Sequence, residues 1–104
     1  MITAEKLIEL ASYFSTISHA NGRIRLRVSP KIVEQKGTIS INDIENLPKQ
    51  IEGINKIKIN KLIGSITIEY NPSIFKKELW DNLVEGENLD EVAEIINKLY
   101  KEVA

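Results

Sequence analysis

The sequence predicts an α+β fold in which helices cover one face of a small, mainly antiparallel sheet. Residues 54–70 alternate apolar and polar side chains on both sides of a turn that ends at Gly64, which indicates a β-hairpin with one buried face. A second alternation runs through residues 23–28. Apolar residues recur at helical spacing in residues 3–14, before the alternation at 23–28, and again after the hairpin. The predicted order is helix, strand, helix, strand, strand, helix, helix.

Residues 3–14 are expected to form the first helix, because apolar side chains recur there at helical spacing. Thr3 is the expected N-cap. The polar stretch 15–22 follows and ends in Asn21-Gly22, a pair that favours a turn or a bulge. Two interpretations of this stretch remain open: the sheet has three strands, or Ser15–His19 adds an edge strand to it.

The strand Arg23–Val28 places three apolar side chains on one face and three arginines on the other. Pro30 ends the strand, and residues 31–38 are expected to form a loop. Residues 40–51 have helical spacing but contain Pro48, which costs about 3 kcal/mol inside a helix. We therefore expect a kink, or a helix that restarts near Pro48. The split β-α-β layout that follows makes the first strand parallel to one hairpin strand.

Two helices are expected after the hairpin. Asn71-Pro72-Ser73 ends the strand and caps a helix that runs to about Val84, where Gly86 breaks it. The last helix, about residues 88–103, has one continuous apolar face. This face either packs within the chain against the first helix or pairs with a partner or a second copy.

Composition narrows the classes of function. A chain of 104 residues is expected to be a single domain, residues 1–104. The net charge of -1 gives no general attraction to nucleic acid or anionic membrane, so any such attraction needs a local patch. The absence of cysteine excludes disulfides, thiolate metal sites and thiol nucleophiles. The first residues lack the pattern of a secretory signal, and no apolar run approaches the roughly 20 residues of a membrane span, so we expect a cytoplasmic protein.

Catalysis is not expected. Acidic residues gather near the start of the last helix, where the helix dipole favours negative charge without any catalytic role. The sequence has neither the nucleophile loop of a Ser-His-Asp enzyme nor a Gly-rich phosphate loop. The chain is therefore expected to bind rather than to catalyse.

Three stretches resemble one known family. The first runs from His19 to Val28 and reads His-x-x-Gly-Arg-x-Arg at its start; the second is Ile51–Ile54; the third runs from Gly64 to Pro72 and reads Gly-Ser-x-x-x-x-Tyr-Asn-Pro. These stretches are similar to the cysteine-free branch of the heavy-metal-associated (HMA-like) domains. The resemblance covers about residues 17–84 and leaves the helices at about 3–14 and 88–103 outside it.

The resemblance implies a ferredoxin-like β-α-β-β-α core, here with extra N- and C-terminal helices. In the parent family a Cys-x-x-Cys loop after the first strand binds copper(I) or zinc. This chain has residues 29–32, Ser-Pro-Lys-Ile, in that region and no cysteine. Thiolate copper transfer is therefore not part of what the resemblance implies.

His19 is the candidate ligand for a transition metal or for haem iron, because imidazole binds both. The competing interpretation is a loop histidine that is hydrogen-bonded to the backbone. One histidine cannot build a tight mononuclear site, so it would need carboxylate or tyrosine partners, a second subunit, or a haem. Tyr13 and Phe14 are candidates to line an apolar haem pocket, although their spacing from Leu10 is also typical of core residues.

Arg23, Arg25 and Arg27 share the open face of the predicted sheet with Lys56 and Lys58. Such a row can bind phosphate, haem propionates or an acidic protein surface. It can equally be a solvated face that prevents aggregation. RNA-binding sheets of this layout carry aromatic residues on the open face, and none is present here, so nucleic acid is a minor alternative.

The sequence therefore favours a non-catalytic binding module that handles a metal ion or haem in metal transport or homeostasis. The alternative is a protein-interaction or assembly domain without a ligand. A third, weaker interpretation is anionic polymer binding by the Arg/Lys face.

Overall fold

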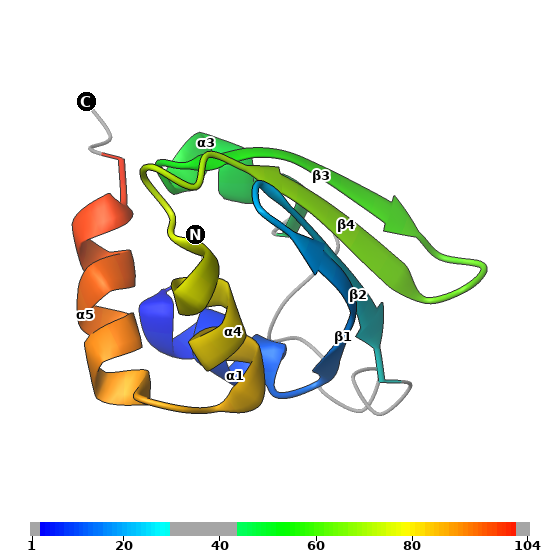
Figure 1. Cartoon of the computed structure of the whole chain (residues 1–104), viewed down its shortest axis with the longest axis horizontal. Coiled ribbons are helices and arrows are strands. Elements are labelled where there is room, and N and C mark those ends of the chain that lie inside the picture. Colours follow the sequence, from blue (N-terminus) through cyan, green and yellow to red (C-terminus); the bar gives the residue numbers. More distant parts are fainter. Residues whose placement is uncertain (1–2, 30–43, 102–104) are drawn as a thin grey trace.

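The computed structural model describes residues 3–29 and 44–101. Helices α1, α4 and α5 gather on one side of a curved sheet, and the hairpin of β3 and β4 extends beyond them (Figure 1). The elements are α1 (Ala4–Ala11), β1 (Phe14–Ala20), β2 (Arg23–Val28), α3 (Leu47–Gln50), β3 (Ile54–Asn60), β4 (Ser65–Tyr70), α4 (Lys77–Glu85) and α5 (Leu89–Leu99).

The described strands form one four-stranded sheet in the order β1-β2-β4-β3, and all neighbouring strands are antiparallel. β2 and β3 consequently run parallel to each other with β4 between them, as the split β-α-β layout predicts. The sheet, with its helices on one face, confirms the α+β class with a ferredoxin-like core and additional helices. The stretch around Ser15–His19 is the fourth strand, and it lies at the edge.

The core lies between the helices and one face of the sheet. The alternation in β2 and β4 buries Ile24, Leu26, Ile66 and Ile68 on this face, while the arginines of β2 stay exposed. The fully buried side chains with the largest volumes are Phe75, Ile24, Leu26, Ile51, Ile96 and Val92. Burial of such side chains contributes about 1.5–3 kcal/mol each, so the two-faced pattern is the main source of stability.

The apolar face of α5 is covered within the chain. α5 packs against α1 and α4, and its Val92 and Ile96 are buried there. The end of α5 is tied to the start of β3: Tyr100 pairs with Ile51, and the Glu52 amide donates to the Leu99 carbonyl at 2.8 Å. Val92 and Ile96, which a partner would have to contact, are already buried within the chain. Pairing through the C-terminal helix therefore stays a prediction.

Several boundaries differ from those expected. α1 begins after its N-cap Thr3, as expected, but ends at Ala11, because the chain turns there into β1. α4 begins at Lys77 rather than at Ser73, because residues 71–75 form a turn in which the Asn71 carbonyl accepts from the amides of Ile74 and Phe75. α5 ends at Leu99, four residues before the expected end, which lies outside the described part.

The helix that restarts near Pro48 is confirmed. Residues 44 and 45 are helical, a turn follows at Asn46, and α3 begins at Leu47 with Pro48 in its first turn. Proline is tolerated there because the first amides of a helix have no partner within it. The expected loop 31–38 and residues 40–43 lie outside the described residues.

Gly53 is the position where the backbone most clearly requires glycine. Its φ is +92°, and a Cβ built there would lie 2.9 Å from Ile74 Cγ2 and 3.1 Å from the Phe75 amide nitrogen. The Gly53 carbonyl also accepts from the Asn71 amide at 2.7 Å. The start of β3 is thus packed directly against the turn that leads into α4.

We expect Gly53→Ala to lower the free energy of unfolding by about 2–4 kcal/mol, from backbone strain and overpacking together. Gly86→Ala is the matched control, because Gly86 also has a positive φ (+74°) but no atom lies within 4 Å of the position that a Cβ would take there. It should cost only about 1 kcal/mol. Chemical denaturation of both variants measures the difference, and equal losses would contradict the packing argument.

Candidate functional site

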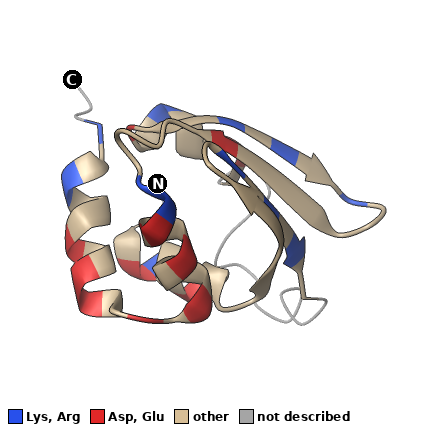
Figure 2. Cartoon of the chain, viewed as in Figure 1, with Lys and Arg blue, Asp and Glu red and all other residues tan. Residues whose placement is uncertain are grey.

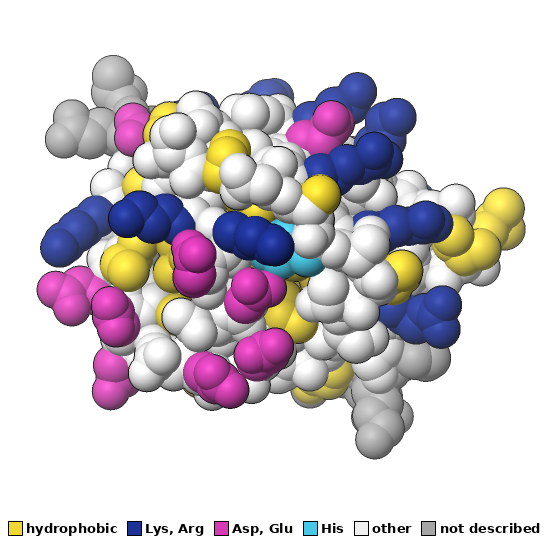
Figure 3. All heavy atoms as spheres, viewed as in Figure 1, with side chains coloured by type: hydrophobic (Ala, Val, Ile, Leu, Met, Phe, Trp, Pro, Cys, Tyr) yellow, Lys and Arg dark blue, Asp and Glu magenta, His cyan; other side chains and the backbone are white. Residues whose placement is uncertain are grey.

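A β-bulge in β1 turns the histidine toward the core. Phe14 pairs with Val28 and Thr16 with Leu26, but the next partners are Ser18 with Arg25 and His19 with Ile24, so Ile17 is left over. An extra residue reverses the alternation of the strand after it. His19 therefore lies on the same face as its partner Ile24, and only 6% of its side chain is exposed. Little of the histidine reaches the surface (Figure 3).

Both ring nitrogens of His19 have partners from other elements. Nδ1 lies 2.8 Å from Oδ1 of Asp81 on α4, and Nε2 lies 2.7 Å from the hydroxyl of Tyr70 at the end of β4. We refer to these three residues as the histidine cluster. It joins the edge strand, the central strand and a helix that are far apart in sequence.

The partners determine where the ring protons lie. A carboxylate only accepts, so Nδ1 carries a proton and donates to Asp81. With a neutral ring, Nε2 holds a lone pair and accepts from the Tyr70 hydroxyl. With a protonated ring, Nε2 donates instead and the Tyr70 hydroxyl can donate to the Ala20 carbonyl, 3.4 Å away. The cluster thus has a consistent hydrogen-bond arrangement in both states.

Tyr70 is held in an aromatic environment. Its ring centroid lies 5.5 Å from that of Trp80 and 6.4 Å from that of Phe75, and these two rings stack at 4.1 Å. Burial raises the pKa of Tyr70 above its ordinary value of 10.0, with a further rise from the nearby carboxylates of Asp81 and Glu78, against a lowering by the backbone hydrogen bond at Gly22. The phenol is therefore protonated at neutral pH and available as a donor to His19.

The other candidate residues lie elsewhere. Arg23, Arg25, Arg27, Lys56 and Lys58 are all exposed on the opposite face of the sheet. Tyr13 lies at the far end of β1, where its carbonyl accepts from the Ser29 amide at 2.7 Å. The structure brings the basic residues together as one group, and two of them, Arg23 and Arg25, line a hollow with His19 and its neighbours Ser18 and Ala20.

Asp81 and Tyr70 were not among the candidates that the sequence indicated. Tyr70 continues the apolar alternation of the hairpin, which predicts only that its ring lies on the buried face, as it does. Asp81 is one of several acidic residues in the C-terminal half, and no local pattern distinguishes it. Only the contact between β1 and α4 identifies it as the partner of the histidine.

A complete metal site is not formed by the part of the chain that the structure describes. Within residues 3–29 and 44–101, no group of three or more His, Cys, Asp or Glu side chains is arranged to hold an ion. The histidine cluster offers one imidazole nitrogen, with a phenol beside it. Any metal held there needs further ligands from outside this set.

Residues 7–101 match the family described as heavy metal associated domain 2. The chain belongs to this family. The match extends beyond the stretch 17–84 that resembles HMA-like domains and takes in most of both terminal helices. Searches of curated proteins and of solved structures found no match to the chain.

Membership of the heavy metal associated domain 2 family identifies the chain as a small metal-associated binding domain. Among the described helices, none has the length and apolar character needed to cross a membrane. The family therefore supports a binding module. The hydrogen bonds of His19 to Asp81 and Tyr70 indicate how that residue could hold a ligand.

The raised pKa of Tyr70 predicts a loss of stability at alkaline pH. Ionising a buried phenol is harder in the folded than in the unfolded chain. The contribution of Tyr70 to the free energy of unfolding should therefore be constant below about pH 10 and fall as pH rises through the raised pKa. We expect Tyr70→Phe to fall less steeply, although it is about 1 kcal/mol less stable at neutral pH because the hydrogen bond to His19 is lost.

Denaturation at several pH values, with tyrosinate absorbance recorded in parallel, measures this dependence. Burial also raises the pKa of Tyr100, so Tyr100→Phe serves as the second variant that separates the two contributions. An alkaline fall of equal steepness in the wild type and in Tyr70→Phe would contradict the prediction.

Proposed function

We propose that this domain is a non-catalytic, cytoplasmic binding module that handles a metal ion or haem in metal transport or homeostasis, with the imidazole of His19 as its ligand. Membership of the heavy metal associated domain 2 family supports a role in metal handling. The hydrogen bond from His19 Nδ1 to Asp81 supports the choice of residue.

This hydrogen bond is the observation that carries the proposal. Histidines that bind metals commonly donate their second ring nitrogen to a carboxylate, which fixes the tautomer and makes the free nitrogen more basic. Asp81 fixes His19 in this way at 2.8 Å and leaves the lone pair on Nε2. A ligand at Nε2 would replace the hydrogen bond from Tyr70.

The burial of the His19 side chain favours a metal ion over haem as the ligand. The His19 side chain is almost completely buried, so an ion can reach Nε2 once the Tyr70 hydroxyl moves aside. A haem would require β1 to separate from α4, which packs against it. Imidazole suits zinc, copper and nickel, and the remaining ligands would be water or groups from a second molecule.

The test uses the untagged chain, in which His19 is the one histidine, so all imidazole NMR signals belong to it. We expect zinc, nickel or copper to shift these signals and to bind in calorimetry, and we expect His19→Ala to abolish binding. Asp81→Asn should weaken binding by about 10- to 100-fold. Tyr70→Phe should preserve or strengthen it, because the competing hydrogen bond is removed.

Lys58→Ala, on β3 and on the opposite face of the sheet, is the matched control and should bind as the wild type does. Absorption spectra after addition of haem test the alternative ligand, since axial ligation by His19 would give a Soret band that His19→Ala lacks. Circular dichroism verifies that each variant is folded. The proposal fails if neither metals nor haem bind, or if folded His19→Ala binds equally well.

A further inference from the structure

The turn between β3 and β4 presents two large apolar side chains to solvent. Leu62 is 98% exposed and Ile63 57%, the two highest values among the exposed large hydrophobic residues. The hairpin carries this turn away from the helices, and hydrophobic side chains protrude at its end (Figures 1 and 3). We call residues 61–64 the hairpin tip. The two side chains are adjacent, and contiguous exposed apolar surface rimmed by polar residues is typical of protein or membrane interaction sites.

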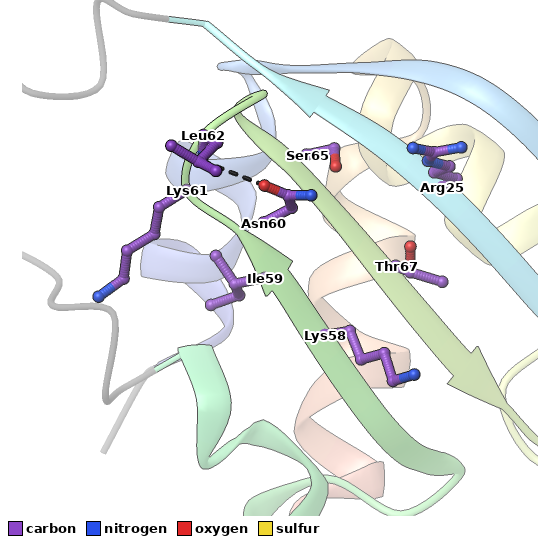
Figure 4. A pocket seen from close by; sticks show the side chains of 8 residues that line it. All are labelled: Arg25, Lys58, Ile59, Asn60, Lys61, Leu62, Ser65 and Thr67. Atoms are coloured by element: carbon purple, nitrogen blue, oxygen red, sulfur yellow. Dashed lines mark hydrogen bonds between the residues drawn. The ribbon is translucent and has the colours of Figure 1, made fainter.

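The hairpin tip has a defined conformation. The side-chain oxygen of Asn60 accepts from the amide of Leu62 at 3.1 Å (Figure 4). The same oxygen accepts from the amide of Ile63 at 3.4 Å. The Gly64 carbonyl accepts from the Val28 amide at 2.8 Å, which fastens the turn to β2. Leu62 and Ile63 are thus held outward by a structured turn.

Positive charge surrounds the base of the tip. Lys61 belongs to the tip itself, and Arg25 and Lys58 lie on either side of Thr67, their common cross-strand partner on β4 (Figure 4). Together with Asn60 and Ser65 they line a shallow hollow behind Leu62. In the next row toward the tip, Arg27 and Asn60 both pair with Ser65.

The one acid on β2, β3 and β4 lies at the far end of this face. Glu69 pairs with Arg23 and Lys56, in the row most distant from the tip. No carboxylate of the described residues lies within ion-pair distance of Arg25, Arg27 or Lys58. The unbalanced positive charge is therefore concentrated beside the exposed apolar side chains.

Acidic residues gather instead on the helices. α4 and α5 carry six acids and two lysines between them, and Figure 2 shows the acids on the helices and the bases along the strands. Positive and negative charges are thus separated on opposite parts of the molecule, although the net charge is only -1. An anionic surface would orient the molecule with the hairpin tip and the basic face of the sheet toward that surface.

We propose that the hairpin tip inserts Leu62 and Ile63 into the surface of an anionic phospholipid bilayer, with Lys58, Lys61, Arg25 and Arg27 contacting the headgroup phosphates. Apolar side chains at the level of the acyl boundary, combined with cations at the level of the headgroups, are the usual requirements of interfacial binding. The hollow between Arg25 and Lys58, with its hydroxyl side chains, suits a phosphate group.

The shape of the tip favours a bilayer over an acidic protein as the occupant. Leu62 protrudes at the end of a narrow hairpin, and a fluid bilayer accepts such a protrusion without a matching pocket. An acidic protein would need both a pocket for the two side chains and carboxylates arranged around it. This second class of partner is an outcome that the experiment distinguishes.

Cosedimentation of the full chain with large vesicles tests the proposal. We expect binding to vesicles of phosphatidylcholine and phosphatidylglycerol, little binding to phosphatidylcholine alone, and a decrease with rising salt. Leu62→Ser with Ile63→Ser should weaken binding by more than about tenfold. Lys58→Gln and Lys61→Gln should each weaken it about fivefold.

Two matched controls probe position. Ile17→Ser removes an apolar side chain that is 43% exposed on β1, and Lys98→Gln removes an exposed cation on α5; both should bind vesicles as the wild type does. Fluorescence of the buried Trp80 verifies folding. A Leu62→Trp variant should show a blue shift on addition of anionic vesicles, whereas Ile17→Trp should not.

The proposal is overturned if the wild type ignores anionic vesicles, if it binds neutral vesicles equally well, or if the Leu62/Ile63 variant binds as the wild type does. Binding to soluble polyglutamate without binding to vesicles would likewise overturn it and indicate an acidic protein partner. None of these outcomes depends on whether His19 binds a metal.

Discussion

The difference between the two faces of the central strands is the constraint on which the rest of the structure depends. Ile24, Leu26, Ile66 and Ile68 must be buried, so the helices have to lie over them, and the charged residues between them are left on the other face. The two candidate sites follow from this division. The histidine cluster belongs to the covered face, and the basic surface with the hairpin tip belongs to the open one.

Because the histidine cluster and the hairpin tip are held by different contacts, the two sites can operate independently. The histidine cluster depends on packing between β1, β4 and α4, which is part of the core. The hairpin tip extends beyond the helices, and its turn rests on hydrogen bonds to Asn60 and β2. If both proposals hold, a domain of this kind could bind its ligand while resting on a membrane surface.

Local patterns in the sequence were sufficient for most of the fold. Period-two alternation identified β2 and the hairpin and assigned the arginines to the open face, and helical spacing with Thr3 and Gly86 located helices whose ends shifted by a few residues. The candidate site was harder to predict from the sequence, because a regular alternation of apolar and polar residues does not indicate a bulge at Ile17. The pairing of His19 with Asp81 joins residues 62 positions apart, which no local pattern encodes.

The bulge also has a consequence for how chain length can vary in this family. Ile17 has no partner in the ladder, and without it the pairs Thr16–Leu26 and Ser18–Arg25 would follow each other regularly. A relative that lacks the residue equivalent to Ile17 would still direct its histidine toward the core. The position of that histidine is therefore best aligned by counting backward from the Asn21-Gly22 turn, and a one-residue gap in this strand marks a difference in strand geometry and not the loss of the site.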